Sequence, residues 1–183
     1  MYISISEAEV VEDRQFDAQT EVDRVHDFLR TMPGFRWAMY LHSLDAPDRF
    51  AAVSMWLSPE QATAQDGAVL GSSTATRGYD VVTARGGMTP ASHVAIVEWQ
   101  VDAEIASGFS NRWNAAYHAI EDRIGSRLLK DLDTPGRHAA LHAVTEESNL
   151  DARTLGAPVE VGEGVEVSPQ SVHRYEVLLL KEA

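Results

Sequence analysis

Apolar and polar residues alternate along the chain with two different periods, and these periods recur in the same order in both halves. The segment 2–6 alternates at every second residue and the segment 93–99 is also strand-like, so both predict β-strands. A helix is predicted over 15–31, because its apolar residues recur three or four positions apart and form one buried stripe. This stripe consists of Val22, Val25, Leu29 and Met32.

The second half repeats this order of a strand followed by a helix. After the strand at 93–99, large apolar residues again recur at spacings of three and four, and Gly125 is expected to end the predicted helix. The stripe consists of Phe109, Trp113, Ala116, Ile120 and Ile124.

One short segment occurs twice. The sequence LHSLDAPDRFAA at 41–52 returns as LKDLDTPGRHAA at 129–140, with a constant offset of 88 residues between Asp45 and Asp133 and between their neighbours. In both copies an Asp-x-Pro-x-Arg turn separates two strand-like runs, and such an aspartate can bind the turn backbone while proline fixes φ. The repeated segment therefore predicts the same β-hairpin twice.

Each hairpin is followed by a weaker helical segment, at 58–69 and 146–156, and then by a closing strand, at 79–84 and 173–181. The loop at 157–170 is rich in Gly, Pro and Glu and is expected to be mobile. Each copy thus predicts the order strand, helix, strand, strand, helix, strand, which is the ferredoxin-like unit.

The predicted fold class is α+β, with two tandem ferredoxin-like copies at 1–88 and 89–183. Helices cover only one face of each antiparallel sheet, so the other face needs a cover. We expect the two sheets to face each other, as in a dimeric α+β barrel, and to enclose a cavity.

Charge and composition exclude several classes of protein. The net charge of −13 opposes binding to nucleic acid and to anionic membranes. The absence of cysteine excludes disulfides, thiolate nucleophiles and cysteine zinc sites. The acidic beginning of the chain carries no long apolar run, so neither a signal peptide nor an anchor is expected, and a cytoplasmic location is the default expectation.

Several short motifs together resemble the antibiotic-biosynthesis-monooxygenase family of dimeric α+β barrels. They are Met32-Pro33-Gly34-Phe35 before a strand, the Asp45-x-Pro47 turn, and the segment from Trp56 to Glu60 at the end of the next strand. The resemblance covers 1–85, and over 91–183 it is visible through the internal repeat.

This resemblance implies a small-molecule oxygenase that needs no cofactor and acts on a phenolic or polycyclic substrate. A non-catalytic binder of a small apolar ligand and a haem-binding barrel remain alternatives. The expected partner is a small molecule, with no nucleic acid and no membrane, and a homodimer of the two-copy chain stays open.

Strand alternation selects the candidate site residues. If Trp56 points away from the helices into the cavity, Ser54 does so too, and the repeat gives His138 and His142 the same orientation. Tyr40 and His42 share one face of the preceding strand, and Trp99 ends the first strand of the second copy with an undecided orientation.

A reaction can be assigned to these residues. His42 or His142 is predicted to accept the proton of a phenol that lies against Trp56, because a neutral histidine titrates close to neutral pH. The predicted substrate-binding residues are Tyr40, Ser54, Trp99 and His138. His138 and His142 lie four residues apart on a predicted strand, about 13 Å, which is too far for one metal ion.

Overall fold

The computed structural model describes residues 1–10, 17–64, 72–118, 123–151, 155–162 and 164–183. The chain divides into two compact units. Unit 1 comprises Met1–Asp80 and Tyr175–Ala183, and unit 2 comprises Val81–Arg174. Compared with the predicted copies 1–88 and 89–183, each unit includes the end of the other copy's last strand.

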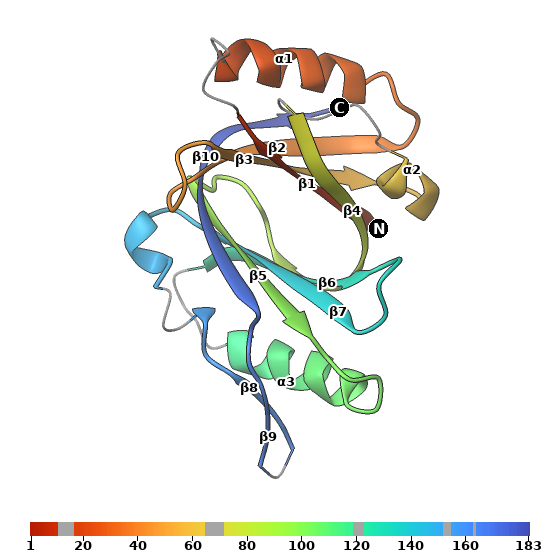
Figure 1. Ribbon diagram of the computed structural model, residues 1–183, viewed down its shortest axis with the longest axis vertical. Coiled ribbons are helices and arrows are strands. Elements are labelled where there is room, and N and C mark those ends of the chain that lie inside the picture. Colours follow the sequence, from red (N-terminus) through yellow and green to blue (C-terminus); the bar gives the residue numbers. More distant parts are fainter. Residues whose placement is uncertain (11–16, 65–71, 119–122, 152–154, 163) are drawn as a thin grey trace. The chain divides into compact units, whose positions relative to one another are not determined.

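Unit 1 contains a sheet with the strand order β4-β1-β3-β2-β10, in which neighbouring strands are antiparallel. One face of this sheet carries helix α1 (Figure 1). The order of the first four strands is that of a ferredoxin-like unit. The elements are β1 (Tyr2–Glu9), α1 (Ala18–Leu29), β2 (Phe35–Ser43), β3 (Arg49–Trp56), α2 (Pro59–Thr63), the first part of β4 (Ser72–Gly86) and most of β10 (Ser171–Glu182).

Unit 2 repeats this plan with the strand order β10-β5-β7-β6-β4, and helix α3 lies on one face of its sheet (Figure 1). The second predicted hairpin is confirmed. Its outgoing strand is 137–144, and its incoming strand, β6, begins earlier in the sequence than the repeated segment does. The elements are β5 (His93–Gln100), α3 (Ala106–His118), β6 (Arg123–Asp131), β7 (Arg137–Val144) and a short 3₁₀ helix η1 (Glu147–Asn149), with β4 and β10 contributing their remaining ends.

Side chains that come shortly before each hairpin turn bind the turn backbone. Ser43 Oγ accepts hydrogen bonds from the amides of Asp45 and Ala46, at 3.2 and 3.1 Å. Asp131 Oδ1 accepts from the amides at 133 and 134, at 2.9 and 2.8 Å. The two turns are thus built alike, although their anchoring side chains stand two residues earlier than the predicted aspartates.

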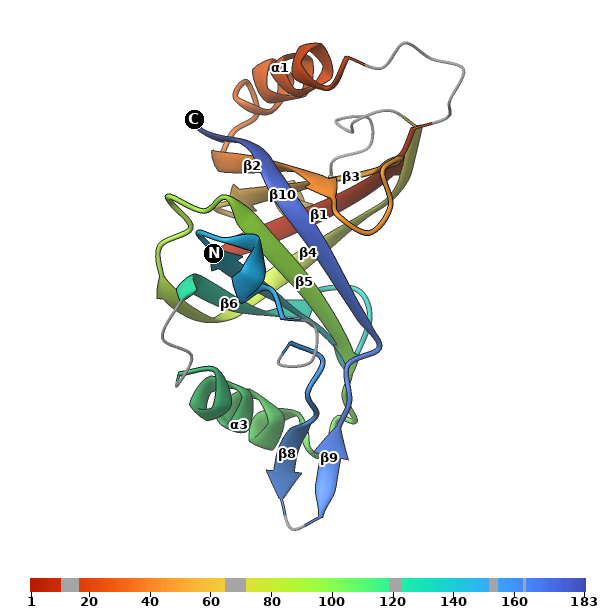
Figure 2. The ribbon, with the colours of Figure 1, turned by 90° about the vertical axis from the view of Figure 1, so that its left-hand side faces the viewer.

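Two sequence predictions about unit 2 are wrong. Ile124 and Gly125 lie in β6 rather than at the end of the helix, which ends at His118; Ile120 is outside the described residues. The segment 157–170 forms a hairpin, β8 (Val159–Gly162) and β9 (Val165–Val167), which extends along and beyond α3 (Figure 2).

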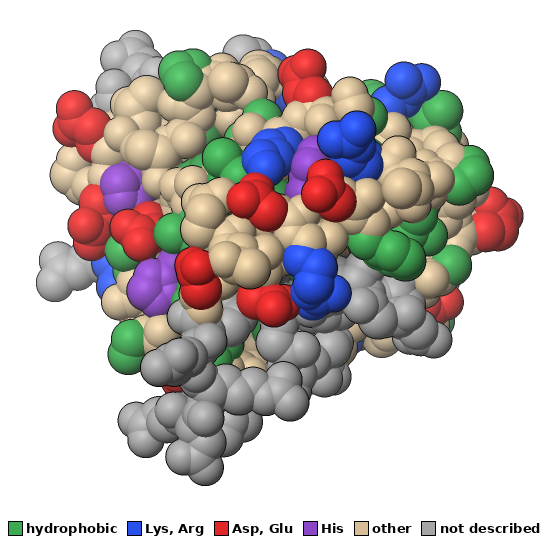
Figure 3. Space-filling model, turned by 90° about the horizontal axis from the view of Figure 1, so that it is seen from above, with side chains coloured by type: hydrophobic (Ala, Val, Ile, Leu, Met, Phe, Trp, Pro, Cys, Tyr) green, Lys and Arg blue, Asp and Glu red, His purple; other side chains and the backbone are tan. Residues whose placement is uncertain are grey.

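Helix α1 begins at a well-formed cap and presents its apolar stripe to the sheet. The Asp17 side chain accepts from the amides of Gln19 and Thr20, which satisfies free donors of the first turn. Two ion pairs form along the helix, Arg24 with Glu21 and Arg30 with Asp27. Seen from above, the surface carries acidic and basic side chains next to each other (Figure 3). No described helix is long and apolar enough to span a membrane.

Candidate functional site

The predicted assignment of the sheet faces is reversed in unit 1. Tyr40 and Trp56 pack in the core that α1 forms with the sheet, together with Val22, Val25 and Leu29. Ser54 and His42 share this face, because they alternate in step with Trp56 and Tyr40 along their strands. These four residues lie on one face, as predicted, but the expectation that this face points away from the helices is wrong.

The same reversal holds in unit 2, where the three predicted residues pack beneath α3. The ring centroids of Trp99 and His138 lie 5.6 and 5.4 Å from that of Phe109, and His142 stacks on Trp113 at 5.7 Å. The seven predicted residues therefore belong to two separate helix-side cores, and the structure does not assemble them into one site.

His138 and His142 have structural surroundings. His138 Nδ1 donates to the Gly136 carbonyl at 3.0 Å, and burial lowers the pKa of His138, so the ring stays neutral at pH 7. His142 is fully buried, and its Nδ1 lies 3.1 Å from Ser126 Oγ. His138 Nδ1 is therefore not open to a ligand, and the His142 ring is enclosed between Trp113 and Ser126.

His42 is also engaged through its whole ring. Its Nδ1 lies 3.2 Å from Glu176 Oε1, its Nε2 lies 2.9 Å from the Pro47 carbonyl, and its ring stacks on Phe50 at 4.7 Å. Both nitrogens are in contact with oxygen atoms of the protein, so neither is open to a substrate. The predicted role of His42 or His142 as the base is not supported by this geometry.

Trp56 is fixed by two serines on neighbouring strands. The β1–β3 register sets Ser4 opposite Ser54, and their hydroxyl oxygens are 2.7 Å apart. The Trp56 indole N–H donates to Ser4 Oγ at 3.1 Å and to Ser54 Oγ at 3.3 Å. All three side chains are buried, so this network holds the indole ring in one orientation.

A histidine that the sequence analysis did not select completes this core. His26 lies on α1, is only 5 % exposed, and has edge-on ring contacts with Phe35 at 5.7 Å and Tyr40 at 6.3 Å. Phe35 in turn contacts Trp56 at 5.4 Å, so the four rings form one group. A signal was present, because position 26 is four residues after Val22 and therefore on the edge of the buried stripe.

Two polar atoms of this ring group have no hydrogen-bond partner within the described parts of the chain: His26 Nδ1 and the Tyr40 hydroxyl. Buried polar groups in native proteins almost always have a hydrogen-bond partner, so these two atoms indicate that a partner is missing. A water molecule or a ligand would supply the missing hydrogen bonds. We refer to His26, Phe35, Tyr40 and Trp56 as the α1 site.

The protonation states of the α1 site follow from its surroundings. Burial, followed by the charge of Lys181, lowers the pKa of His26, so the ring is neutral at pH 7. The Glu182 carbonyl accepts a hydrogen bond from this ring, and because Nδ1 has no partner, the donor is Nε2. Burial raises the pKa of Tyr40, so its hydroxyl remains a donor.

An ion pair joins α1 to the edge of the sheet close to this site. Lys181 Nζ on β10 lies 2.5 Å from Asp23 Oδ1 on α1, and this hydrogen bond lowers the pKa of Asp23. Both side chains are partly exposed, so the contact is weak in water and can open.

The α1 site and the predicted histidines do not suit a metal or haem. The described residues contain no group of three or more His, Asp and Glu side chains that could hold a metal ion. A haem iron needs an accessible imidazole nitrogen, whereas His42 is engaged at both nitrogens, His142 is held between Trp113 and Ser126, and His26 Nδ1 is buried against Phe35 and Tyr40. We therefore derive no step through haem.

Comparison with known proteins identifies structural relatives only. No model of a known protein family matches the chain, and no curated protein matches it in sequence. A candidate monooxygenase from Fusobacterium nucleatum has a similar structure, with a TM-score of 0.71 and 9 % identity over 99 % of this chain and 94 % of that one.

Two further solved structures share the fold. An anthrone oxidase-like protein aligns with a TM-score of 0.62 and 11 % identity over 100 % of this chain and 93 % of that one. A ferredoxin-fold protein from Listeria monocytogenes, related to antibiotic biosynthesis monooxygenases, aligns with a TM-score of 0.50 and 10 % identity over 94 % of each chain. At these identities the likeness concerns the fold.

Proposed function

We propose that this chain, which has the fold of the proteins related to antibiotic biosynthesis monooxygenases, is an oxygenase that acts on a phenolic or polycyclic substrate without a cofactor. The predicted class, an α+β protein of the dimeric α+β barrel type with ferredoxin-like units, is confirmed. The specific activity is our inference, and it rests on the α1 site.

The observation that carries the proposal is the pair of buried, unpartnered polar atoms at the α1 site. A phenolic hydroxyl is both a donor and an acceptor of hydrogen bonds. Bound here, it would donate to His26 Nδ1 and accept from the Tyr40 hydroxyl, and so satisfy both atoms. Phe35 and Trp56 would provide an apolar aromatic surface for the ring of the substrate.

The chemistry of the first step follows from these contacts. His26 Nδ1 takes the phenolic proton as the O–H bond breaks, and Tyr40 stabilises the phenolate oxygen by its hydrogen bond. The phenolate passes one electron to dioxygen, which gives superoxide and a substrate radical. Dioxygen is therefore the oxidant, and the substrate itself supplies the electrons.

The remaining steps balance without another reductant. Superoxide and the radical combine through a new C–O bond at the ring carbon opposite the phenolic oxygen, and the proton returns to give a hydroperoxide. Loss of water leaves a quinone, so one oxygen atom of dioxygen enters the product and the other leaves as water.

Substrate entry requires a movement of α1, since His26 and Tyr40 are buried. The helix is short and is held to β10 by the partly exposed Lys181–Asp23 pair. An outward movement of this helix exposes the α1 site without separating any strand of the sheet. Lids of this kind open on the microsecond to millisecond timescale in many enzymes.

Oxygen uptake in the presence of 1,8-dihydroxyanthrone tests the proposal. We expect enzyme-dependent uptake and quinone formation. His26→Gln should reduce them by at least about a hundredfold, the lower end of the range for general base catalysis, and Tyr40→Phe should also reduce them, because the phenolate oxygen loses its hydrogen bond. The matched control is His93→Gln, a histidine in unit 2 outside the α1 site. Saturable binding without uptake would identify a non-catalytic binder, and uptake that His26→Gln leaves unchanged would contradict the proposed base.

A further inference from the structure

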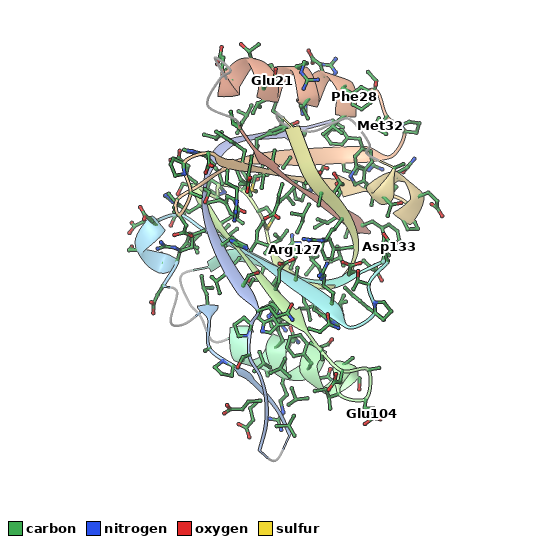
Figure 4. All side chains as sticks on the ribbon, in the orientation of Figure 1. Glu21, Phe28, Met32, Glu104, Arg127 and Asp133 are labelled. Carbon is green, nitrogen blue, oxygen red and sulfur yellow. The ribbon has the colours of Figure 1, made fainter. Side chains whose placement is uncertain are left out.

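A second polar feature lies in unit 2, on a strand that the proposed reaction does not use. Arg127 comes from β6 (Figure 4) and is half-buried. Its Nη1 donates to the carbonyls of Arg85 at 2.7 Å and Ser126 at 2.9 Å, and its Nη2 donates to the Gly86 carbonyl at 3.0 Å. Three of the five guanidinium N–H groups are thus held by backbone oxygens.

Closely packed glycines position the carbonyls that hold Arg127. A Cβ atom on Gly86 would lie 2.0 Å from the Ile124 carbonyl, and one on Gly125 would lie about as close to the Gly87 carbonyl, at 1.7 Å. Only glycine permits this approach of β4 to β6. The close packing of β4 and β6 therefore fixes the backbone carbonyls that bind the guanidinium.

The positive charge of Arg127 has no counter-charge in the described part of the chain. The ion pairs found there join other arginines to carboxylates, such as Arg24 to Glu21 and Arg49 to Glu9. Burial lowers the pKa of Arg127, and no charged neighbour contributes to this shift. A partly buried charge without a partner is costly, so its presence indicates an anionic ligand.

The fold itself does not require this charge. At the offset of 88 residues, the position that corresponds to Arg127 in unit 1 is Met39, which is fully buried. The same strand position in the same kind of sheet is therefore compatible with an apolar side chain. This comparison favours a role for Arg127 in binding over a role in folding.

We propose that Arg127 forms an anion-binding site for the carboxylate of a small molecule. The donors left after the three carbonyl contacts are Nε–H and one Nη2–H, and they share one edge of the planar group when the Gly86 carbonyl takes the Nη2 hydrogen on the Nη1 side. This edge matches the two oxygens of a carboxylate and forms paired, charge-assisted hydrogen bonds. The site is separate from the α1 site and does not depend on the proposed oxygenase activity.

Calorimetric titration of the full chain with benzoate in low-chloride buffer tests this site. We expect saturable binding by the native protein, weakened at least about tenfold in Arg127→Met and also in Arg127→Lys, which keeps the charge but loses the planar edge. Arg112→Met, an exposed arginine on α3, is the control and should leave the affinity unchanged.

The outcomes separate the alternatives. Circular dichroism establishes that each variant is folded, and Arg127→Lys remains informative if Arg127→Met unfolds. No saturable benzoate binding, or equal affinity in the native protein and in Arg127→Lys, would overturn the proposal. Binding of inorganic phosphate but not of benzoate would overturn the carboxylate assignment. A failure of the oxygenase assay leaves this titration unaffected.

Discussion

The helix-side cores of the two units occupy corresponding strand positions but are filled in different ways. At the offset of 88 residues, Ser54 corresponds to His142 and Tyr40 corresponds to Leu128. In unit 2 the rings of Phe109 and Trp113 fill the space beneath α3. Phe109 has edge-on and tilted contacts with Trp99 and His138, and Trp113 stacks on His142. In unit 1 the corresponding core contains a serine network and the α1 site.

The two cores also differ in their buried polar atoms that have no hydrogen-bond partner. In unit 2 the Trp99 indole N–H and Asp131 Oδ2 are also without a hydrogen-bond partner among the described residues, whereas at the α1 site the unpartnered donor and acceptor belong to two neighbouring rings, with centroids 6.3 Å apart. Locally unfavourable groups persist where function requires them. The comparison favours a stabilising role for the core of unit 2 and agrees with the ligand binding that we propose for the core of unit 1.

The largest expected effect is on stability and concerns the helix-side core of unit 2. Trp113→Ala removes a fully buried ring that stacks on His142, and should lower the free energy of unfolding by about 3–5 kcal/mol. Chemical denaturation followed by circular dichroism measures this change. Since the α1 site is in the other unit, the affinity for a phenol such as 1-naphthol should not change at temperatures where the variant is folded.

Tyr40→Phe should have the opposite pattern. It removes a buried hydroxyl that has no partner, so the free energy of unfolding should stay the same or rise slightly. The affinity for 1-naphthol should fall about tenfold, which equals 1.4 kcal/mol, because the phenolic oxygen loses its donor. A loss of stability without a loss of affinity would show that Tyr40 serves packing alone.

The pH dependence of stability sharpens the comparison further. Burial first, and then Lys181, lower the pKa of His26 below its unfolded value, and Asp27 and the Glu182 carbonyl oppose this shift. The unfolded chain therefore binds more protons, so this contribution is complete above about pH 6.5 and is lost as the pH falls towards the folded pKa.

Burial lowers the pKa of His138 in the same direction, and its hydrogen bond to Gly136 opposes the shift. Unfolding titrations between pH 4 and 8 should show part of the acid loss disappear in His26→Gln and another part in His138→Gln. Only the first substitution should change 1-naphthol binding. An unchanged pH profile in both variants would contradict the assigned burial of these rings.

Ser54→Ala should have the smallest effect. Trp56 keeps its hydrogen bond to Ser4 when Ser54 is removed, so the loss of stability should be about 1 kcal/mol. The same variant should weaken 1-naphthol binding less than Tyr40→Phe does, which competition titrations can measure. A loss as large as that of Tyr40→Phe would place the serine network in direct contact with the ligand.

The strands and hairpins were predictable because turn chemistry and alternation are local signals. The sequence did not show which face of each sheet meets its helix. The reason is that β1 and β5 are buried on both faces, with the same burial pattern from Tyr2 and His93 onwards. A strand covered on both sides reads as a continuous apolar run, and alternation then groups residues by face without saying which face meets the helix. His42 was selected on this uncertain basis.

Two other differences from the prediction have equally physical causes. Gly125 resembled a helix end, but its role is the close approach of β6 to β4, which only the three-dimensional structure reveals. The β8–β9 hairpin was hidden by its Gly and Glu residues, although Val159, Val161, Val165 and Val167 carry a period of two. His26 was missed because a histidine beside an apolar stripe is usually solvated.

The most direct test compares the binding of 1-naphthol and of its methyl ether, 1-methoxynaphthalene, to the native protein. The two ligands share the same aromatic surface, and only the naphthol has a proton to donate to His26 Nδ1. We predict that the ether binds at least about tenfold more weakly, and that His26→Leu, which leaves no acceptor, abolishes the difference. Equal affinities for the two ligands would contradict the claim that the α1 site recognises a phenolic hydroxyl.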